Sequence, residues 1–346
     1  MRIITAMLLA VTLTLTPATT GVPTALAAVQ NTTPTHARPH PASAAFTHAR
    51  PRVAGAASAQ ARSRVAGAAS SHVRSGVAGG VFAAPAGVVR SLAAGGGPRK
   101  VRAASGYLVD AETGRVLWSR RAGGRRAIGS ITKVMTALVV LRAGRLDRRI
   151  RVKPGHLAYA AAWNGSTARL RPGDRFTTRE LLNAMLLPSG CDAAAALADA
   201  YGGQRRFVRR MNRTARSLGL RRTRYADSAG LHPAGYSTAR DQVRLARHAM
   251  RDAAFRQIVV RGRYVAGASK GHRRYVWRST NELAGVYQGM LGIKSGHTAA
   301  AGYSFVFAAR RDGRTLVGAV LNSSPTDPGA RFRDAVRVLN WSFRRP

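Results

Sequence analysis

Two residues one helical turn apart, Ser130 and Lys133, are of the types that serve as a nucleophile and its base. The apolar residues that follow have helical spacing, which predicts a helix over residues 130–140 with both side chains on one face. A desolvated lysine can take the proton of a hydroxyl, and a helix N-terminus stabilises the negative charge of acyl transfer. Alone, the pair is weak evidence, because an N-cap serine followed by a surface lysine explains most Ser-x-x-Lys sequences.

Lysine is scarce in this chain, which narrows the choice of a base. Of the 56 basic residues only five are lysine, namely Lys100, Lys133, Lys153, Lys270 and Lys294. Arginine stays protonated inside proteins, so chemistry that needs a neutral amine must use one of these five.

Two further elements follow the first pair along the chain: Ser189-Gly190-Cys191 and Lys294-Ser295-Gly296-His297-Thr298. The three elements together are much more specific than any one of them. In this order they resemble the motifs of the low-molecular-mass penicillin-binding proteins, the serine D-alanyl-D-alanine carboxypeptidases. The resemblance spans about Gly106 to Leu321.

The resemblance implies a role for each residue that matches a motif. Ser130 would be the acylated nucleophile, and Lys133 would activate it, although which group acts as base differs among accounts of such enzymes. Ser189 would relay a proton to the leaving amine and border Lys133. The backbone N–H groups of Ser130 and His297 would form the oxyanion hole.

The third element is expected to bind the end of the substrate. Lys294 would set the electrostatics of the site, while Ser295 and Thr298 would hold the terminal carboxylate. A fixed cation with two hydroxyls on a strand edge recognises such a group directly. By resemblance, the substrate is a peptidoglycan stem peptide ending in D-Ala-D-Ala, β-lactams acylate the same serine, and neither a cofactor nor a metal is required.

Cys191 departs from the family pattern, which usually has asparagine at this substrate-binding position. A thiol is a poor substitute for an amide, so the balance between hydrolysis and transpeptidation stays open. A β-lactamase-like hydrolase is a second alternative, but class A enzymes need a deacylating glutamate. The chain has only Glu112, Glu180 and Glu282. A non-catalytic wall-binding or sensor protein of the same fold is a third alternative.

The elements that would position these residues predict one α/β domain of three layers, similar to the penicillin-binding and β-lactamase fold. Its antiparallel sheet would unite N-terminal and C-terminal strands, with flanking helices and a mostly helical insertion. The expected strands cover residues 106–110, 116–118, 289–294, 303–309 and 315–321. The expected helices cover residues 130–140, 178–187, 192–200, 205–218 and 238–250, with a final amphipathic helix around 332–339 that packs on the sheet rather than on a membrane.

Residues 1–27 have the parts of a secretory signal: a basic start, an apolar run and small residues before a cleavage point after Ala27. Retention as a membrane anchor is the alternative. Residues 28–100 are rich in Ala, Gly, Pro and Arg and contain short repeats, which predicts a disordered linker. The catalytic domain is expected over residues 101–346.

The formal net charge of +42 would suit a nucleic acid, but an exported protein does not meet one. Outside the cell, anionic wall polymers and the membrane surface are the partners that such a charge would attract. A general bias towards arginine explains the charge equally well. With Cys191 as the only cysteine, an intramolecular disulfide is excluded.

Overall fold

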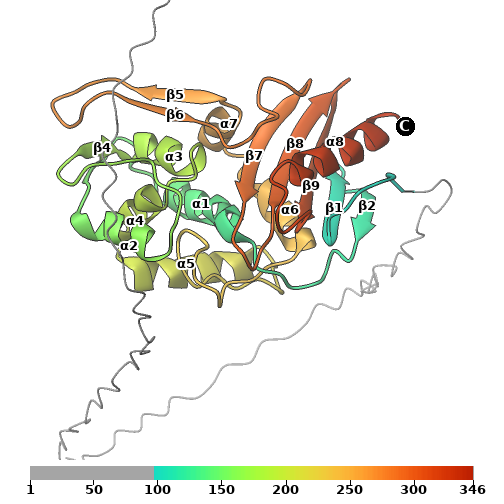
Figure 1. Ribbon diagram of the computed structural model, residues 1–346, viewed down its shortest axis with the longest axis horizontal. Coiled ribbons are helices and arrows are strands. Elements are labelled where there is room, and N and C mark those ends of the chain that lie inside the picture. Colours follow the sequence, from blue (N-terminus) through green and yellow to red (C-terminus); the bar gives the residue numbers. More distant parts are fainter. Residues whose placement is uncertain (1–96, 346) are drawn as a thin grey trace, which may run out of the picture. The chain divides into compact units, whose positions relative to one another are not determined.

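The computed structural model describes residues 97–345, so the predicted signal peptide and nearly all of the predicted linker lie outside the described residues. A five-stranded antiparallel sheet with the order β2-β1-β9-β8-β7 lies on one side of the described part of the chain, beside most of the helices (Figure 1). Its strands are β1 (Ser105–Asp110), β2 (Val116–Arg120), β7 (Met290–Gly296), β8 (Ser304–Arg311) and β9 (Arg314–Leu321). Every residue of β1 pairs with β9, which confirms the predicted sheet of N-terminal and C-terminal strands.

The turn between β8 and β9 shows how local sequence sets the register. Asp312 and Gly313 both have positive φ, at 47° and 74°, and Arg311 pairs with Arg314 around them. A two-residue loop of this kind matches the twist of the strands it joins, and Asp-Gly is among its preferred sequences. The predicted hairpin is therefore confirmed, with its register fixed at the turn.

The sheet carries helices on both faces, which gives the predicted three layers (Figure 1). Alternate residues of β8 point to opposite faces, so Phe305 and Phe307 pack with the final helix α8 (Ala330–Phe343). Val306 and Ala308 belong to the core that also includes α6 (Ala239–Ala249). The amphipathic final helix thus buries its apolar face on the sheet, as expected.

The remaining helices form the insertion between β2 and β7. They are α1 (Lys133–Ala143), α2 (Pro154–Ala162), α3 (Thr178–Leu186), α4 (Cys191–Ala200), α5 (Gln204–Ser217) and α7 (Ala253–Val259). Helix α1 contacts α3, α4, α5, α6 and α7, and its first eight residues are all buried. It is the axis on which the insertion packs, so the residues at its start are held from several sides.

The sequence did not predict two small sheets, nor the helices α2 and α7. The sheets pair β3 (Arg149–Arg151) with β4 (Arg175–Thr177), and β5 (Arg263–Ala266) with β6 (Tyr275–Arg278). Phe176 anchors the first sheet by stacking on the His272 ring at 4.2 Å between centroids. These strands are three or four residues long and rich in arginine, so an alternation of period two has no length in which to appear.

Candidate active site

Ser130 lies in a short 3-10 helix, η1 (Gly129–Thr132), that leads directly into α1. The prediction of a continuous α-helix from Ser130 is therefore wrong by one turn. In a 3-10 helix the side chains of residues i and i+3 eclipse each other. Accordingly, Lys133 Nζ lies 2.8 Å from Ser130 Oγ and donates a hydrogen bond to it.

The Lys133 side chain is fully buried, and its amine nitrogen has three hydrogen-bond partners. Besides Ser130, it donates to the backbone oxygen of Ala229 at 3.1 Å and to Cys191 Sγ at 3.3 Å. Burying an amine without such partners would cost several kcal/mol. These contacts hold the amine in place beside the Ser130 hydroxyl.

The Cys191 thiol faces Lys133 and not the solvent. The residue is fully buried, and its backbone N–H donates to Ser166 O at 2.7 Å. A Cβ added to Gly165 would lie 3.0 Å from Sγ, so the thiol is closed in from that side as well. In this arrangement the predicted substrate-binding residue Cys191 has no surface that a substrate could touch, and its contact is with the lysine.

Ser189 lies at the break between α3 and α4, as expected from Pro188-Ser189-Gly190. Its φ of 66° is in the left-handed region, which a residue other than glycine adopts only under constraint. The side chain is buried, and its hydroxyl makes no hydrogen bond with any residue of the described range 97–345. The predicted contact between Ser189 and Lys133 is thus not a hydrogen bond here, because Cys191 holds that position.

Lys294 is the second buried lysine of the site, with 1% of its surface exposed. Its Nζ donates to Ser295 O at 3.0 Å. Burial, followed by the positive charges of Lys133 and Arg331, holds the pKa of Lys294 well below its ordinary value. The positive charge of Lys133 therefore disfavours the protonated form of Lys294.

The two hydroxyls of the third element are both near the end of β7. Ser295 Oγ lies 2.8 Å from Thr280 Oγ1, and Thr298 Oγ1 accepts the N–H of Ala301 at 3.1 Å. Sequence reasoning did not single out Thr280, because no motif contains it and its role depends on a contact between distant segments.

Arg331 is a further residue that the motifs did not reveal. It lies in the first turn of α8, only 8% exposed, with its guanidinium 5.0 Å from the centre of the Tyr303 ring. Its charge contributes to lowering the pKa of both Lys294 and His297, for which burial is the largest cause. In the sequence, Arg331 lies between the apolar residues Ala330 and Phe332, and this was the available signal of its burial. Other arginines of the same helix, which are more exposed, made Arg331 look like a surface residue.

The backbones of η1 and β7 are in direct contact. A Cβ added to Gly129 would lie 3.1 to 3.2 Å from the backbone atoms of His297, and one added to Gly296 would lie 2.6 Å from Ile128 O. Gly129 also has a φ of 52°, which glycine adopts without cost. Glycine at both positions lets the backbone before Ser130 and the backbone at His297 approach closely, and the oxyanion hole of Ser130 and His297 stays a prediction. The His297 ring itself stacks on Tyr303, 4.0 Å between centroids.

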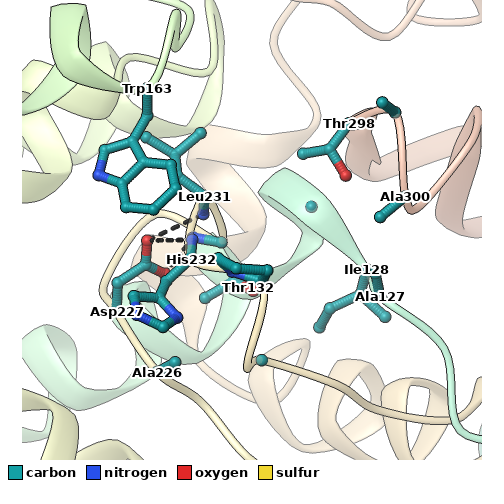
Figure 2. A pocket seen from close by; sticks show the side chains of 15 residues that line it. Ala127, Ile128, Thr132, Trp163, Ala226, Asp227, Leu231, His232, Thr298 and Ala300 are labelled. Carbon is teal, nitrogen blue, oxygen red and sulfur yellow. Dashed lines mark hydrogen bonds between the residues drawn. The ribbon is translucent and has the colours of Figure 1, made fainter. Parts of the chain in front are cut away.

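A pocket of about 200 Å³ lies beside these residues and is called the Thr298 pocket below (Figure 2). Trp163 stands on one side, and Thr298 and Ala300 stand on the other. The lining residues are Ala127, Ile128, Gly129, Thr132, Trp163, Ala226, Asp227, Gly230, Leu231, His232, Pro233, Gly235, Thr298, Ala299 and Ala300. Since Gly129 and Thr132 flank Ser130 in η1, the pocket opens next to the nucleophile.

Asp227 shapes the wall of the Thr298 pocket. Its carboxylate accepts the backbone N–H groups of Gly230, Leu231 and His232 at 2.6, 2.9 and 3.0 Å (Figure 2). The Tyr159 hydroxyl also donates to it, at 2.8 Å, and burial together with this carboxylate raises the pKa of Tyr159. Asp227 is therefore engaged in holding a turn.

Within residues 97–345, no group of three or more His, Cys, Asp and Glu side chains is arranged to hold a metal ion. Over the same residues, no helix has the length and apolar character needed to span a membrane.

Comparisons with known proteins agree with the arrangement of these motifs. The family described as D-alanyl-D-alanine carboxypeptidase, peptidase family S11, matches residues 93–325. The D-alanyl-D-alanine carboxypeptidase of Streptomyces sp. strain K15 is 38% identical over 257 residues, which cover 70% of this chain and 88% of that protein. DacF of Bacillus subtilis, also named D-alanyl-D-alanine carboxypeptidase, is 30% identical over 247 residues, 70% of this chain and 62% of that protein.

A likeness in structure accompanies the likeness in sequence. The crystal structure of the Streptomyces K15 DD-transpeptidase superposes with a TM-score of 0.69 and 38% identity, covering 72% of this chain and all of that one. The serine, the two lysines and the glycine contacts described above lie within the matched residues 93–325. The chain therefore belongs to the S11 family of serine D-alanyl-D-alanine carboxypeptidases and has the fold of the penicillin-binding DD-peptidases.

Proposed function

We propose that this carboxypeptidase is exported and acts on peptidoglycan stem peptides through an acyl-enzyme on Ser130. The single observation that carries this assignment is the 2.8 Å contact between Ser130 Oγ and the buried amine of Lys133. A nucleophile and a base within hydrogen-bond reach, with the base fixed by further contacts, is the arrangement that covalent catalysis requires.

In the acylation step, Lys133 in its neutral form takes the proton of Ser130 as the hydroxyl oxygen attacks the carbonyl carbon of the D-Ala-D-Ala bond. The backbone N–H groups of Ser130 and His297 stabilise the oxyanion that forms. When the C–N bond breaks, the proton taken by Lys133 reaches the leaving amine through Ser189, which ends the step unchanged. Water then attacks the ester and gives one proton to Lys133, which returns it to Ser130 Oγ as the shortened peptide leaves.

Binding of the terminal carboxylate falls to the end of β7. Ser295 and Thr298 offer hydroxyls there, and Lys294 and Arg331 are the basic side chains that accompany them. The charge of Arg331 disfavours the protonated form of Lys294, and a bound carboxylate offsets that repulsion. A peptide that ends in a free carboxylate is therefore favoured over one that continues.

Transfer of the acyl group to an amine, that is transpeptidation, is the second candidate fate of the acyl-enzyme. The Streptomyces K15 protein is named both a carboxypeptidase and a DD-transpeptidase. β-Lactams enter the same site and acylate Ser130. Their rapid release in the manner of a class A β-lactamase is not favoured, since Glu180 is bound to the Thr177 cap and to His272.

The positive charge of the chain favours association with anionic wall polymers or the membrane surface. One groove of the described residues has several arginines in its lining. This arginine groove, of about 530 Å³, is lined by Arg247, Arg251, Arg256 and Arg310. The side chains of Arg251 and Arg310 donate no hydrogen bond to any residue of the described range, which leaves them available to an anion.

The test of the proposed function is the intact mass of the full chain after incubation with a penicillin. One adduct is expected on the natural protein and none on Ser130→Ala. Release of D-Ala from a D-Ala-D-Ala peptide should be lost in the same variant. An adduct that persists in Ser130→Ala, or a natural protein that forms no adduct, would show that the nucleophile is wrongly assigned.

A further inference from the structure

The arginine groove has an apolar floor, which separates it from the rest of the basic surface. The floor consists of Met250, Val260, Leu291 and Val317. Val317 is buried in the core between the sheet and α6, and Met250 and Leu291 pack against that core while part of their surface stays exposed. Val260 is 44% exposed. The groove therefore opens an edge of the core to solvent, and an apolar ligand that covers this edge is stabilised by its burial.

The arginines of the groove divide into two that are fixed and two that are available. Arg247 and Arg256 donate hydrogen bonds to backbone oxygens at 2.8 to 3.3 Å, which fixes their guanidinium groups. Arg251 and Arg310 are exposed, and their side chains donate no hydrogen bond to another residue of the range 97–345. Glu112 is the one acid of the lining, so the four arginines leave a net charge of +3. Two exposed cations thus lie beside an apolar floor.

The groove lies at the opposite end of β7 from Ser130. Leu291 is near the start of this strand, whereas Gly296 at its end lies against η1. Five residues of strand separate Leu291 from Gly296, roughly 17 Å at the antiparallel rise of about 3.4 Å per residue. Helix α7 packs beside β7 and contributes Arg256 and Val260 to the groove (Figure 1). A ligand in the groove would leave the active site open to a peptide.

We propose that the arginine groove binds an alkyl chain of an anionic lipid on its apolar floor, with the acidic headgroup at Arg251 and Arg310. This specifies the proposed association with an anionic surface and rests on that part of the proposed function. The groove volume of about 530 Å³ is within the range of about 300 to 1,000 Å³ that is usual for ligand sites. The chain gains from hydrophobic burial, and the guanidinium groups pair with the phosphate.

The floor disfavours two other classes of anion. A wall polymer of polyols and phosphates is polar along its whole length and gains nothing from apolar contact. A peptide brings backbone N–H and C=O groups that need partners, whereas the neutral polar side chains of the lining are Gln257 and Thr315. An alkyl chain brings no polar group. The lipid is therefore the ligand whose chemistry matches both the floor and the two available arginines.

The experiment uses three small ligands to separate the contribution of the chain from that of the charge. The full chain is titrated in a calorimeter with decyl phosphate, ethyl phosphate or decylphosphocholine, each below the concentration at which it forms micelles. Ethyl phosphate has the acidic headgroup without the long chain, and decylphosphocholine has the chain with a headgroup of no net charge. We expect decyl phosphate to bind at least about tenfold more tightly than either of the others.

The charge is tested by Arg251→Gln together with Arg310→Gln. This pair should weaken decyl phosphate about threefold to tenfold and leave decylphosphocholine unchanged, since only the phosphate monoester brings a net charge. Arg205→Gln with Arg209→Gln is the matched control, because it removes the same charge from exposed positions of α5 that lie outside the lining. The control should leave decyl phosphate binding nearly as it is.

The floor is tested by Val260→Ser, with Val116→Ser as its control. Val116 is 42% exposed on β2, close to the 44% of Val260, and lies outside the lining. Val260→Ser should weaken decyl phosphate about threefold to fivefold without changing ethyl phosphate, because only the long chain covers the floor. Val116→Ser should change neither.

Several outcomes would overturn the proposal. Equal affinity for ethyl phosphate and decyl phosphate would mean that charge alone attracts the anion, as for a wall polymer. Equal losses in the two arginine pairs, or in the two valine variants, would place the ligand elsewhere. Loss of binding after penicillin has acylated Ser130 would place it in the active site. Failure of the Ser130 assignment is recognised separately, as the absence of a penicillin adduct, and would leave decyl phosphate binding unchanged.

Discussion

The Thr298 pocket and the arginine groove differ in the charges that line them, although both belong to the same domain. The pocket has no arginine or lysine in its lining, whereas the groove has four arginines and one acid, Glu112, over an apolar floor of Met250, Val260, Leu291 and Val317. The groove follows the composition of the chain and the pocket departs from it. In a chain this rich in arginine, several arginines in a lining are expected from composition alone. A lining without arginine is not, and is therefore the better indication of a specific role.

The same contrast holds between the two kinds of basic residue. Lys133 and Lys294 are buried, at 0% and 1% exposure, and both lie in the active site. Arg251 and Arg256 of the groove lie near the surface and act through their charge. The two buried lysines of the described residues thus belong to the catalytic chemistry, and the arginines of the groove belong to the surface.

The largest effect should come from exchanging one kind of residue for the other inside the site. Lys133→Arg keeps a positive charge but removes a base that can be neutral, so penicillin acylation should slow by roughly 10³-fold. The rate is measured as adduct formation by intact mass. Lys270→Arg, an exchange on an exposed residue, is the control and should acylate at the natural rate. Normal acylation of Lys133→Arg would show that this lysine is not the base.

A second prediction concerns the rigidity of the pocket wall. A Cβ on Gly230 would lie 1.9 Å from Gly129 O, beside the nucleophile, so Gly230→Ala should lower the free energy of unfolding by about 2 to 4 kcal/mol and slow acylation. Gly285 has a similar positive φ, 76° against 84°, but nothing within 4 Å. Gly285→Ala should therefore cost only about 1 kcal/mol. Equal losses in urea unfolding would mean that the backbone angle, and not the contact, is what matters.

The smallest effect is expected at the groove. Arg251→Gln together with Arg310→Gln should weaken binding of inorganic polyphosphate about threefold to tenfold at low salt, with a smaller loss at high salt. The matched pair Arg205→Gln and Arg209→Gln removes the same charge from the exposed side of α5. If both pairs weaken binding equally in titration calorimetry, the charge acts as a whole and the groove has no special part in it.

Sequence reasoning was strongest where the chemistry depends on neighbours in the chain. Ser130 and Lys133 are three residues apart, so almost any helical turn brings them together, whether 3-10 or α. The strands expected over residues 303–309 and 315–321, joined by a turn at Asp312-Gly313, were likewise predicted from local signals.

What the sequence did not reveal depends on contacts between distant segments. Arg331 reaches the site from the last helix, and Thr280 meets Ser295 from a loop. The direction of the Cys191 side chain also follows from how α4 packs beside α1, which no motif encodes. Each of these features needs the whole domain to be assembled.

The pairing of β1 with β9 has a consequence for when the protein becomes active. Ser130 and Lys133 are made early in the chain, but β1 gains its second partner, β9, and Lys294 and Arg331 take their places, only when the last strands and α8 are present. Contacts between such distant residues form slowly, because a long loop must close first. A partly synthesised chain would hold the nucleophile and its base on one helix without a substrate site, so activity and completion of the fold arrive together.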